Sequence, residues 1–123
     1  MGNALPMSQK QFIGKYGEDL SAKYLQDRGY QIIGRNWRCN FGEIDLIARE
    51  GNLIVFVEVK TRNGSGYGHP FEAITSLKVS RLRRLAAQWC AEHQISGSNV
   101  RLDAIAVLIS NGKVSIEHLK QAF

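Results

Sequence analysis

Long apolar runs are absent from this chain of 123 residues. A charged residue interrupts every hydrophobic stretch within about a dozen residues, whereas a transmembrane helix needs roughly twenty consecutive apolar ones. We therefore expect no membrane-spanning segment and no membrane partner. The N-terminal residues also lack the apolar central region of a secretory signal peptide, so a cytoplasmic location is the expectation.

Cysteine is scarce as well. Cys39 and Cys90 lie far apart, so a small cytoplasmic domain would keep both reduced and packed as small hydrophobic residues. Cys90 and His93 have a spacing that serves half of a zinc site, but the sequence has no second pair for the other half, and we expect neither a disulfide nor zinc. A Ser-His-Asp arrangement, a phosphate-binding glycine loop and a dinucleotide fingerprint are also missing.

Basic residues are in modest excess: 16 Lys and Arg residues against 11 Asp and Glu residues give a formal net charge of +5. Such a balance favours polyanionic partners. With 44% hydrophobic and 22% charged residues, the chain has the composition of a single globular domain. We expect the domain to span residues 1–123, with residues 1–8 as a disordered N-terminal segment.

Two stretches have helical periodicity. Between Gln9 and Arg28, apolar and aromatic residues recur at every fourth position, with Ser8 as a cap before them and Gly29 as a stop after them. The second helix is predicted over residues 76–93. Trp37 and Trp89 are expected to be core or partly buried packing residues.

The remaining patterns predict five strands. Three form an antiparallel meander over residues 30–38, 43–49 and 53–61, and two more cover residues 100–109 and 113–117. Because the fourth strand follows the second helix, it can pair beside the third through a crossover. The order predicts an α/β (α+β) fold, with one mixed sheet flanked by helices. A glycine-rich loop over residues 63–70 follows the third strand, a position where loops often carry function.

Carboxylates concentrate on the second and third strands. Glu58 and Lys60 are two residues apart and share a face of the strand, roughly 7 Å from each other. In an antiparallel hairpin, Asp45 lies opposite or diagonal to Glu58, within reach of one shared cation. Two or three oxygen ligands with waters are the usual protein share of a Mg²⁺ site, and the lysine adds a positive charge for a phosphate.

A second interpretation accounts for the same residues about equally well: an edge strand with Glu58 and Lys60 facing solvent. Burying charges is costly unless they are paired or bound to a metal, so the apolar context of this strand favours a site. Glu43 either approaches the same cation or points outward. Arg101 and Asp103 share a face of the fourth strand, where we expect a structural pair.

The run Gly42-Glu43-Ile44-Asp45-Leu46-Ile47-Ala48, followed by Phe56-Val57-Glu58-Val59-Lys60-Thr61-Arg62, resembles the YraN-like uncharacterised protein family of the restriction-endonuclease-like superfamily. Further matching positions are Gly17-Glu18, Asn36, Arg38, Lys78 and Arg101-Leu102-Asp103. The resemblance covers most of the chain and implies a restriction-endonuclease-like αβββαβ core. The family is similar to archaeal Holliday-junction resolvases, which implies metal-dependent phosphodiester hydrolysis.

The resemblance also implies roles for individual residues. Asp45 and Glu58 would be metal ligands, with the Val59 backbone carbonyl as a third, and Lys60 would be the catalytic lysine. Glu18 resembles the helix-one glutamate of the resolvases. A solvated partner of Lys15 or another helix neighbour is an equal alternative for Glu18 on the residues alone. The implied cofactor is Mg²⁺ or Mn²⁺.

Basic residues supply candidate nucleic-acid contacts. Lys78, Arg81 and Arg84 are spaced by three along the second helix and could contact successive phosphates, although a solvated helix face explains them as well. Arg62, together with His69, would extend this basic path along the glycine-rich loop. Tyr67 would stack on an unpaired base.

The favoured hypothesis is a metal-dependent endonuclease that acts on DNA of branched, single-stranded or otherwise non-duplex structure. The alternative is a non-catalytic nucleic-acid-binding or recruitment module on the same fold, and a third hypothesis is a purely structural interaction domain. Symmetric cutting of two strands needs two active sites, which favours a homodimer.

Overall fold

The fold is built on one five-stranded sheet with the strand order β1-β2-β3-β4-β5. A computed structural model describes residues 7–64, 69–96 and 99–122. In chain order the elements are α1 (Gln9–Asp27), β1 (Gln31–Cys39), β2 (Gly42–Glu50), β3 (Leu53–Asn63), the 3-10 helix η1 (Pro70–Ala73), α2 (Ser76–Glu92), β4 (Val100–Ser110) and β5 (Lys113–Leu119). The expected αβββαβ order is therefore present, with β5 added to it.

The strand pairing agrees with the sequence-based expectation. Strands β1, β2 and β3 form an antiparallel meander, β4 runs parallel to β3, and β5 returns antiparallel to β4. Asn111 and Gly112 form the turn between β4 and β5 with φ angles of 52° and 75°. Positive φ at both positions is what a two-residue hairpin turn of the favoured twist requires. The predicted mixed α+β fold is confirmed.

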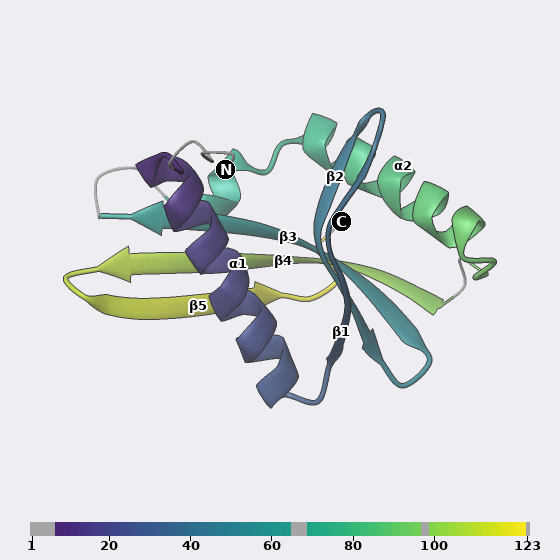
Figure 1. Cartoon of the computed structure of the whole chain (residues 1–123), viewed down its shortest axis with the longest axis horizontal. Helices are drawn as coiled ribbons and strands as arrows, with labels where there is room; N and C mark the ends of the chain where they lie inside the picture. The colour runs from purple at the N-terminus through teal and green to yellow at the C-terminus, as the bar shows by residue number, and fades with distance from the viewer. Residues whose placement is uncertain (1–6, 65–68, 97–98, 123) are drawn as a thin grey trace, which may run out of the picture.

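The two long helices cover opposite faces of the sheet (Figure 1). One core joins Leu25 of α1 to Val55 and Val57 of β3, and the other joins α2 to Phe56. Successive β3 residues enter different cores because strand side chains alternate between faces. The Trp89 ring meets the edge of Phe56 with their centroids 5.5 Å apart, so Trp89 is a core residue as predicted.

Helix α1 begins with a capping box. The Ser8 hydroxyl accepts a hydrogen bond from the Gln11 N–H at 3.1 Å, and the Gln11 side chain accepts one from the Ser8 N–H at 3.0 Å. Of the segment 1–8 expected to be disordered, residues 1–6 lie outside the described residues. Ser8 contradicts that expectation, because the reciprocal bonds fix it as the helix cap.

The connections also refine the prediction. Strand β3 continues to Asn63, two residues past its predicted end, and η1 was not predicted. Residues 65–68 of the predicted glycine-rich loop lie outside the described residues, as do residues 97–98 after α2.

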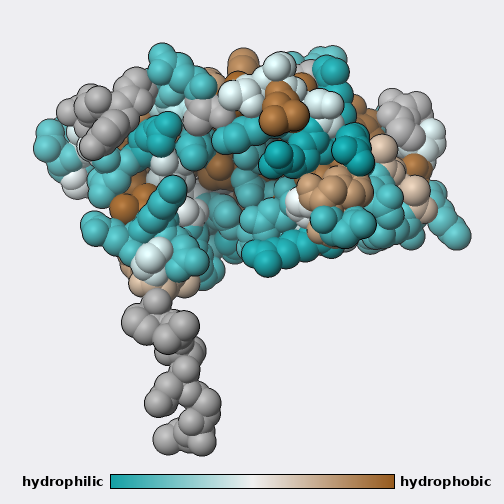
Figure 2. All heavy atoms as spheres, turned by 90° about the horizontal axis from the view of Figure 1, so that it is seen from above, coloured by the Kyte–Doolittle hydropathy of each residue, from teal (hydrophilic) through white to brown (hydrophobic). Residues whose placement is uncertain are grey.

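Among the described residues, neither long helix has the length and apolar character needed to span a bilayer. The face shown in Figure 2 is mostly hydrophilic, with hydrophobic side chains in small separate patches.

A close contact sets the position of α1 on the sheet. A Cβ atom added to Gly17 would lie 1.8 Å from Oγ1 of Thr61 on β3, so only glycine lets the helix backbone approach this strand so closely. Gly14, one turn earlier, has nothing within 4 Å of the same position. The helix therefore touches β3 at Gly17 and leaves space in front of Gly14.

A buried polar network joins β4 to β5. The Asp103 carboxylate is fully buried and accepts hydrogen bonds from Arg101 at 2.8 and 2.9 Å, from His118 at 2.7 Å and from the Gln121 N–H at 3.0 Å. Arg101 also donates to the Tyr30 hydroxyl at 2.7 Å. The predicted structural pair Arg101–Asp103 is confirmed, and it is the centre of a larger network.

We expect Gly17→Ala to destabilise the protein by about 1–3 kcal/mol, since the new methyl group must displace Thr61. Gly14→Ala in the same helix is the matched control and should stabilise by roughly 0.5–1 kcal/mol through helix propensity. Urea denaturation of the two variants measures both effects. Equal effects of the two substitutions would contradict the close contact.

Asp103→Ala should cost about 3–5 kcal/mol, because it leaves the guanidinium of Arg101 without its buried partner. Asp27→Ala, which removes an exposed pair with Lys23, should cost less than about 1 kcal/mol.

Stability should also depend on pH through Asp103. Burial opposes its ionisation, but hydrogen bonds from His118 and Arg101 hold the pKa of Asp103 below its ordinary value. Its contribution is therefore complete above the unfolded pKa of about 3.9 and is lost as the pH falls through the lower folded pKa. Denaturation curves should converge for the parent and Asp103→Ala in strong acid, and a constant gap down to that range would contradict the assignment.

Candidate active site

The candidate active site lies where β2 separates from β3. The two strands are paired as far as Leu46 opposite Val57, and the pairing stops there. Toward the hairpin tip, β2 pairs only with β1, up to Gly42 opposite Cys39. Figure 1 shows this tip rising beside α2. A cavity of about 280 Å³ opens at the separation, lined by residues of β2, β3 and α2.

Asp45 is the first residue of β2 beyond this pairing, and its side chain replaces the missing strand. Its Oδ2 atom accepts a hydrogen bond of 2.8 Å from the Val59 N–H. Buried backbone donors need a partner, so this bond lets β3 continue past the separation without an unpaired N–H. The Val59 carbonyl as a third metal ligand stays a prediction, because the contact seen here is made by its N–H.

Asp45 and Glu58 form a pair of partly buried carboxyl groups. Burial, followed by the charge of Glu58, raises the pKa of Asp45 to about 8 against the effect of the Val59 hydrogen bond. Burial also raises the pKa of Glu58, although Lys78 and Lys60 act in the opposite direction. Two neighbouring carboxylates resist ionising together. The structure thus brings these two predicted residues together in a site that attracts positive charge.

Lys60 lies near this carboxyl pair and has other basic residues around it. Burial, followed by the charges of Lys78 and Arg62, lowers the pKa of Lys60. Three basic residues are therefore close enough to influence one another beside the Asp45–Glu58 pair. Such an arrangement can hold a metal through the carboxylates and a phosphate through the cations.

The basic row predicted on α2 reaches the site in part. Lys78 and Arg81 line the 280 Å³ cavity together with Asp45 and Glu58. The guanidinium of Arg84 lies over the ring of Phe41, 4.7 Å from its centroid, and is not part of that lining. Two of the three predicted residues therefore face the carboxylates.

Glu18 enters the site from α1 and is held by β1. Its Oε1 atom accepts a hydrogen bond of 2.9 Å from the Asn36 amide, and its charge contributes to the raised pKa of Asp45. Asn36 has a φ of 50°, a conformation uncommon for a residue with a side chain. Lys15, the helix neighbour proposed for Glu18, pairs with Asp19 at 3.6 Å, and the metal-site role of Glu18 stays a prediction.

Other predicted residues have different partners. Glu43 lines the cavity, but its carboxylate accepts a hydrogen bond of 2.8 Å from Arg38. His69 lies 2.9 Å from Glu117 of β5, a contact that removes it from the predicted basic path. Tyr67 lies outside the described residues.

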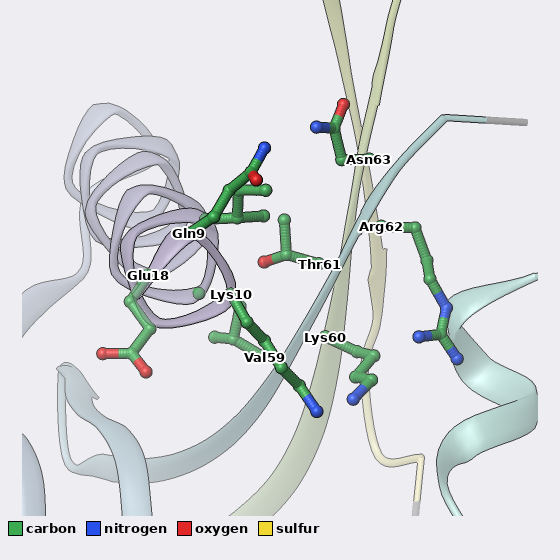
Figure 3. Close-up of a pocket in the computed structure, with 10 residues that line it drawn as sticks. Gln9, Lys10, Glu18, Val59, Lys60, Thr61, Arg62 and Asn63 are labelled. Carbon is green, nitrogen blue, oxygen red and sulfur yellow. The ribbon is translucent and has the colours of Figure 1, made fainter. Parts of the chain in front are cut away.

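Arg62 belongs to a second cavity, of about 610 Å³, between α1 and β3. Figure 3 shows its guanidinium extending away from the helix. Its Nε atom is buried and has no hydrogen-bond partner within the described part of the chain. The predicted contact of Arg62 with DNA stays a prediction.

Known sequences identify the family. A model described as "Uncharacterised protein family UPF0102" matches residues 17–107. The chain belongs to this family. UPF0102 proteins of Beutenbergia cavernae and Rhodococcus opacus are each 50% identical to it, and the alignments cover 93% and 95% of this chain and 98% and 100% of the relatives. The resemblance to the YraN-like family is confirmed.

Two solved structures are similar to this UPF0102 member at low identity. One, of an EndoMS-dsDNA2 complex, is 14% identical with a TM-score of 0.46, covering 81% of this chain and 36% of that one. The other, a repair endonuclease from Pyrococcus abyssi, is 17% identical with a TM-score of 0.46, covering 90% and 42%. The chain spans less than half of either protein.

The donor set of this UPF0102 member fits a hard divalent cation such as Mg²⁺ or Mn²⁺. Burial raises the pKa values of both Asp45 and Glu58, a bound cation would favour their ionised forms, and such cations prefer oxygen ligands. The described residues contain no group of three His, Cys, Asp or Glu side chains that could hold a metal. Two carboxylates suffice for Mg²⁺, which keeps several waters or phosphate oxygens.

Sequence reasoning missed the partners that orient these residues. Asn36 matched the family pattern but received no role, and Lys10 was not considered. The charge of Lys10 lowers the pKa of Lys60, so the two side chains are neighbours. A signal was present, because Lys10, Gly14 and Glu18 recur every four residues and share one face of α1.

Asp45→Asn should stabilise the metal-free protein. The pKa of Asp45 is raised to about 8 in the folded state from an ordinary aspartate value of about 3.9, so folding takes up a proton between these values. The parent's free energy of unfolding therefore falls as the pH rises from 4 to 8, and the variant escapes this loss. Thermal denaturation in EDTA should show a Tm advantage of Asp45→Asn that grows over this range.

Asp27→Asn is the control for this measurement, because it makes the same change on the exposed surface of α1. It should leave the pH dependence of Tm unchanged. A Tm difference between the parent and Asp45→Asn that is constant with pH would show that Asp45 ionises normally.

Proposed function

We propose that this protein is a metal-dependent endonuclease that hydrolyses DNA phosphodiester bonds at Asp45, Glu58 and Lys60. The observation that carries the proposal is the juxtaposition of a partly buried carboxyl pair with cations, in an open cavity. A structural role for these charges is disfavoured, because burial raises the pKa values of both carboxyl groups, whereas hydrogen bonds from His118 and Arg101 hold the pKa of the buried Asp103 below its ordinary value.

A divalent cation bound at the carboxylates would polarise the scissile phosphate and lower the pKa of a water. Asp45 and Glu58 supply the oxygen ligands, and the Val59 N–H holds the Asp45 carboxylate in place. Lys60 has a lowered pKa and lies beside the pair, where it can orient the attacking water or offset charge in the transition state. Glu18, fixed by Asn36, is a further acidic group at the edge of the site.

We propose the substrate from the positive charge of the cavity lining and of the chain as a whole. Lys78 and Arg81 line the same cavity as the carboxylates, and the net charge of the chain is +5. Cations beside an acidic centre give a polyanion contacts that are independent of base sequence. We assign DNA as the polyanion and branched or non-duplex structures as its form. Paired incisions across a junction would indicate two copies of the chain acting together.

A cleavage panel tests the function. Single-stranded, duplex, flap and four-way-junction DNA are incubated with Mg²⁺ or Mn²⁺ and the parent protein, Asp45→Asn or Lys60→Ala. We expect the parent to cut at least one substrate and each variant to lose at least about a hundredfold in rate, since both changes remove transition-state stabilisation. Asp27→Asn and Lys113→Ala, which alter exposed residues of the same types, should cut like the parent.

Calorimetry with Mn²⁺ separates the alternatives. The parent should bind the metal, and Glu58→Gln should weaken binding by tenfold or more, since a ligand is lost. Intact DNA with every protein, together with junction DNA shifted in a gel, would favour the non-catalytic binding module. Absence of both metal and DNA binding would favour the structural domain.

A further inference from the structure

We infer that the cavity between α1 and β3 is a subsite for one unpaired nucleotide adjacent to the scissile phosphate. The inference rests on the proposed nuclease function and narrows its substrate class to DNA that is interrupted by an unpaired nucleotide. At about 610 Å³, this cavity is more than twice as large as the 280 Å³ cavity that holds Asp45 and Glu58. Its volume is within the range of pockets that bury small organic groups.

The cavity is a neighbour of the active site along β3, although the two share no lining residue. Glu58 lines the smaller cavity, whereas the next two residues, Val59 and Lys60, line the larger one. Glu18 also lines the larger cavity, and its charge reaches Asp45. Lys60 lines the larger cavity and its charge acts on Glu58 of the smaller one, so a phosphate held at Lys60 would lie near the acidic pair and its nucleotide could enter the larger cavity.

The lining matches the parts of a nucleotide. Figure 3 shows the amide side chains of Gln9 and Asn63 at one end of the cavity and the amino groups of Lys10 and Lys60 at the other. Amides both donate and accept hydrogen bonds, as the edges of bases do. Ammonium groups suit the phosphate. Ile13 also lines the cavity and offers an apolar surface to the flat face of a base.

The cationic end lacks an anion of its own. Lys10 makes no ion pair within the described residues, and its charge reaches Lys60. Two ammonium groups held near each other repel, and a bound phosphate would relieve this repulsion. A nucleotide phosphate therefore gains more at this end than at an isolated surface lysine.

The subsite favours an unpaired nucleotide for an energetic reason. A base in a regular duplex must be unpaired and unstacked before it can enter a pocket, which costs a few kcal/mol, and an unpaired base has already lost much of that stabilisation. The same cavity would thus discriminate against continuous duplex without reading sequence.

Gly14 offers a sharp test, because it lines the cavity and a Cβ there meets nothing within 4 Å. Gly14→Leu fills the cavity and replaces a glycine within a helix by a good helix former. Gln26→Leu makes an apolar change on the exposed part of the same helix and is the control. Asn63→Ala is a second variant, which removes one amide and leaves the cavity open.

Binding is measured by fluorescence anisotropy in EDTA, so that no DNA is cut. The probes are a continuous duplex, the same duplex with one bulged nucleotide, and the same bulge without its base. The parent and Gln26→Leu should bind the complete bulge about tenfold more tightly than the other two probes. Gly14→Leu should lose this preference, and Asn63→Ala should reduce it.

Equal binding of the three probes by the parent, absence of DNA binding, or an unchanged preference in both cavity variants would overturn the subsite. Failure of the nuclease proposal is distinguishable from these results. A preference for the bulged base that persists in a protein without cleavage in Mg²⁺ or Mn²⁺ supports the subsite and overturns only the catalytic role. Cleavage by a parent that has no such preference overturns only the subsite.

Discussion

The hydrogen bond from the Val59 N–H to the Asp45 carboxylate is the interaction on which the site depends. It allows β2 to leave β3 after Leu46 while β3 stays paired with β4 and continues to Asn63. Without the Asp45 carboxylate, the Val59 N–H would be a buried donor with no strand beside it to accept its hydrogen bond. The same bond fixes the carboxylate at the mouth of the cavity, so one contact both ends the strand pairing and positions a candidate ligand.

Much of the fold could be predicted from the sequence because local signals were strong. The strand patterns over residues 100–109 and 113–117 match β4 and β5 closely, and the crossover after the second helix placed the fourth strand beside the third, as β4 lies beside β3. The separation of β2 from β3 was less accessible. Strict alternation predicts continued pairing past Leu46, whereas the pairing ends there and the Asp45 side chain takes the Val59 N–H. The prediction that Asp45 lies near Glu58 does not depend on this detail, since β2 and β3 are neighbours whether or not their pairing continues past Leu46.

Side-chain partners were harder to predict than the elements. Glu18 is held by Asn36, whose positive φ has no sequence signal comparable to a glycine in a turn. His69 was expected beside DNA but is engaged by Glu117, 48 positions away along the chain. Asp103 illustrates the same limit. Its pairing with Arg101 could be predicted because the two residues are two positions apart on one strand, whereas the contacts of this pair with His118 and Tyr30 depend on how the whole sheet is assembled. Contacts between distant segments depend on the register of several strands at once, which periodicity alone does not fix.

Gly17 has a consequence for how this architecture can vary. Since the helix backbone meets Thr61 there, α1 has a fixed point on β3, with Glu18 immediately after it. Residues before that point, including Lys10 and Gly14, form one wall of the larger cavity and leave the core largely to the later turns. The first two turns of α1 are thus a region in which substitutions can remodel a binding surface while the acidic centre and the sheet stay as they are. One helix thus carries the wall of the larger cavity before Gly17 and the acidic residue Glu18 after it.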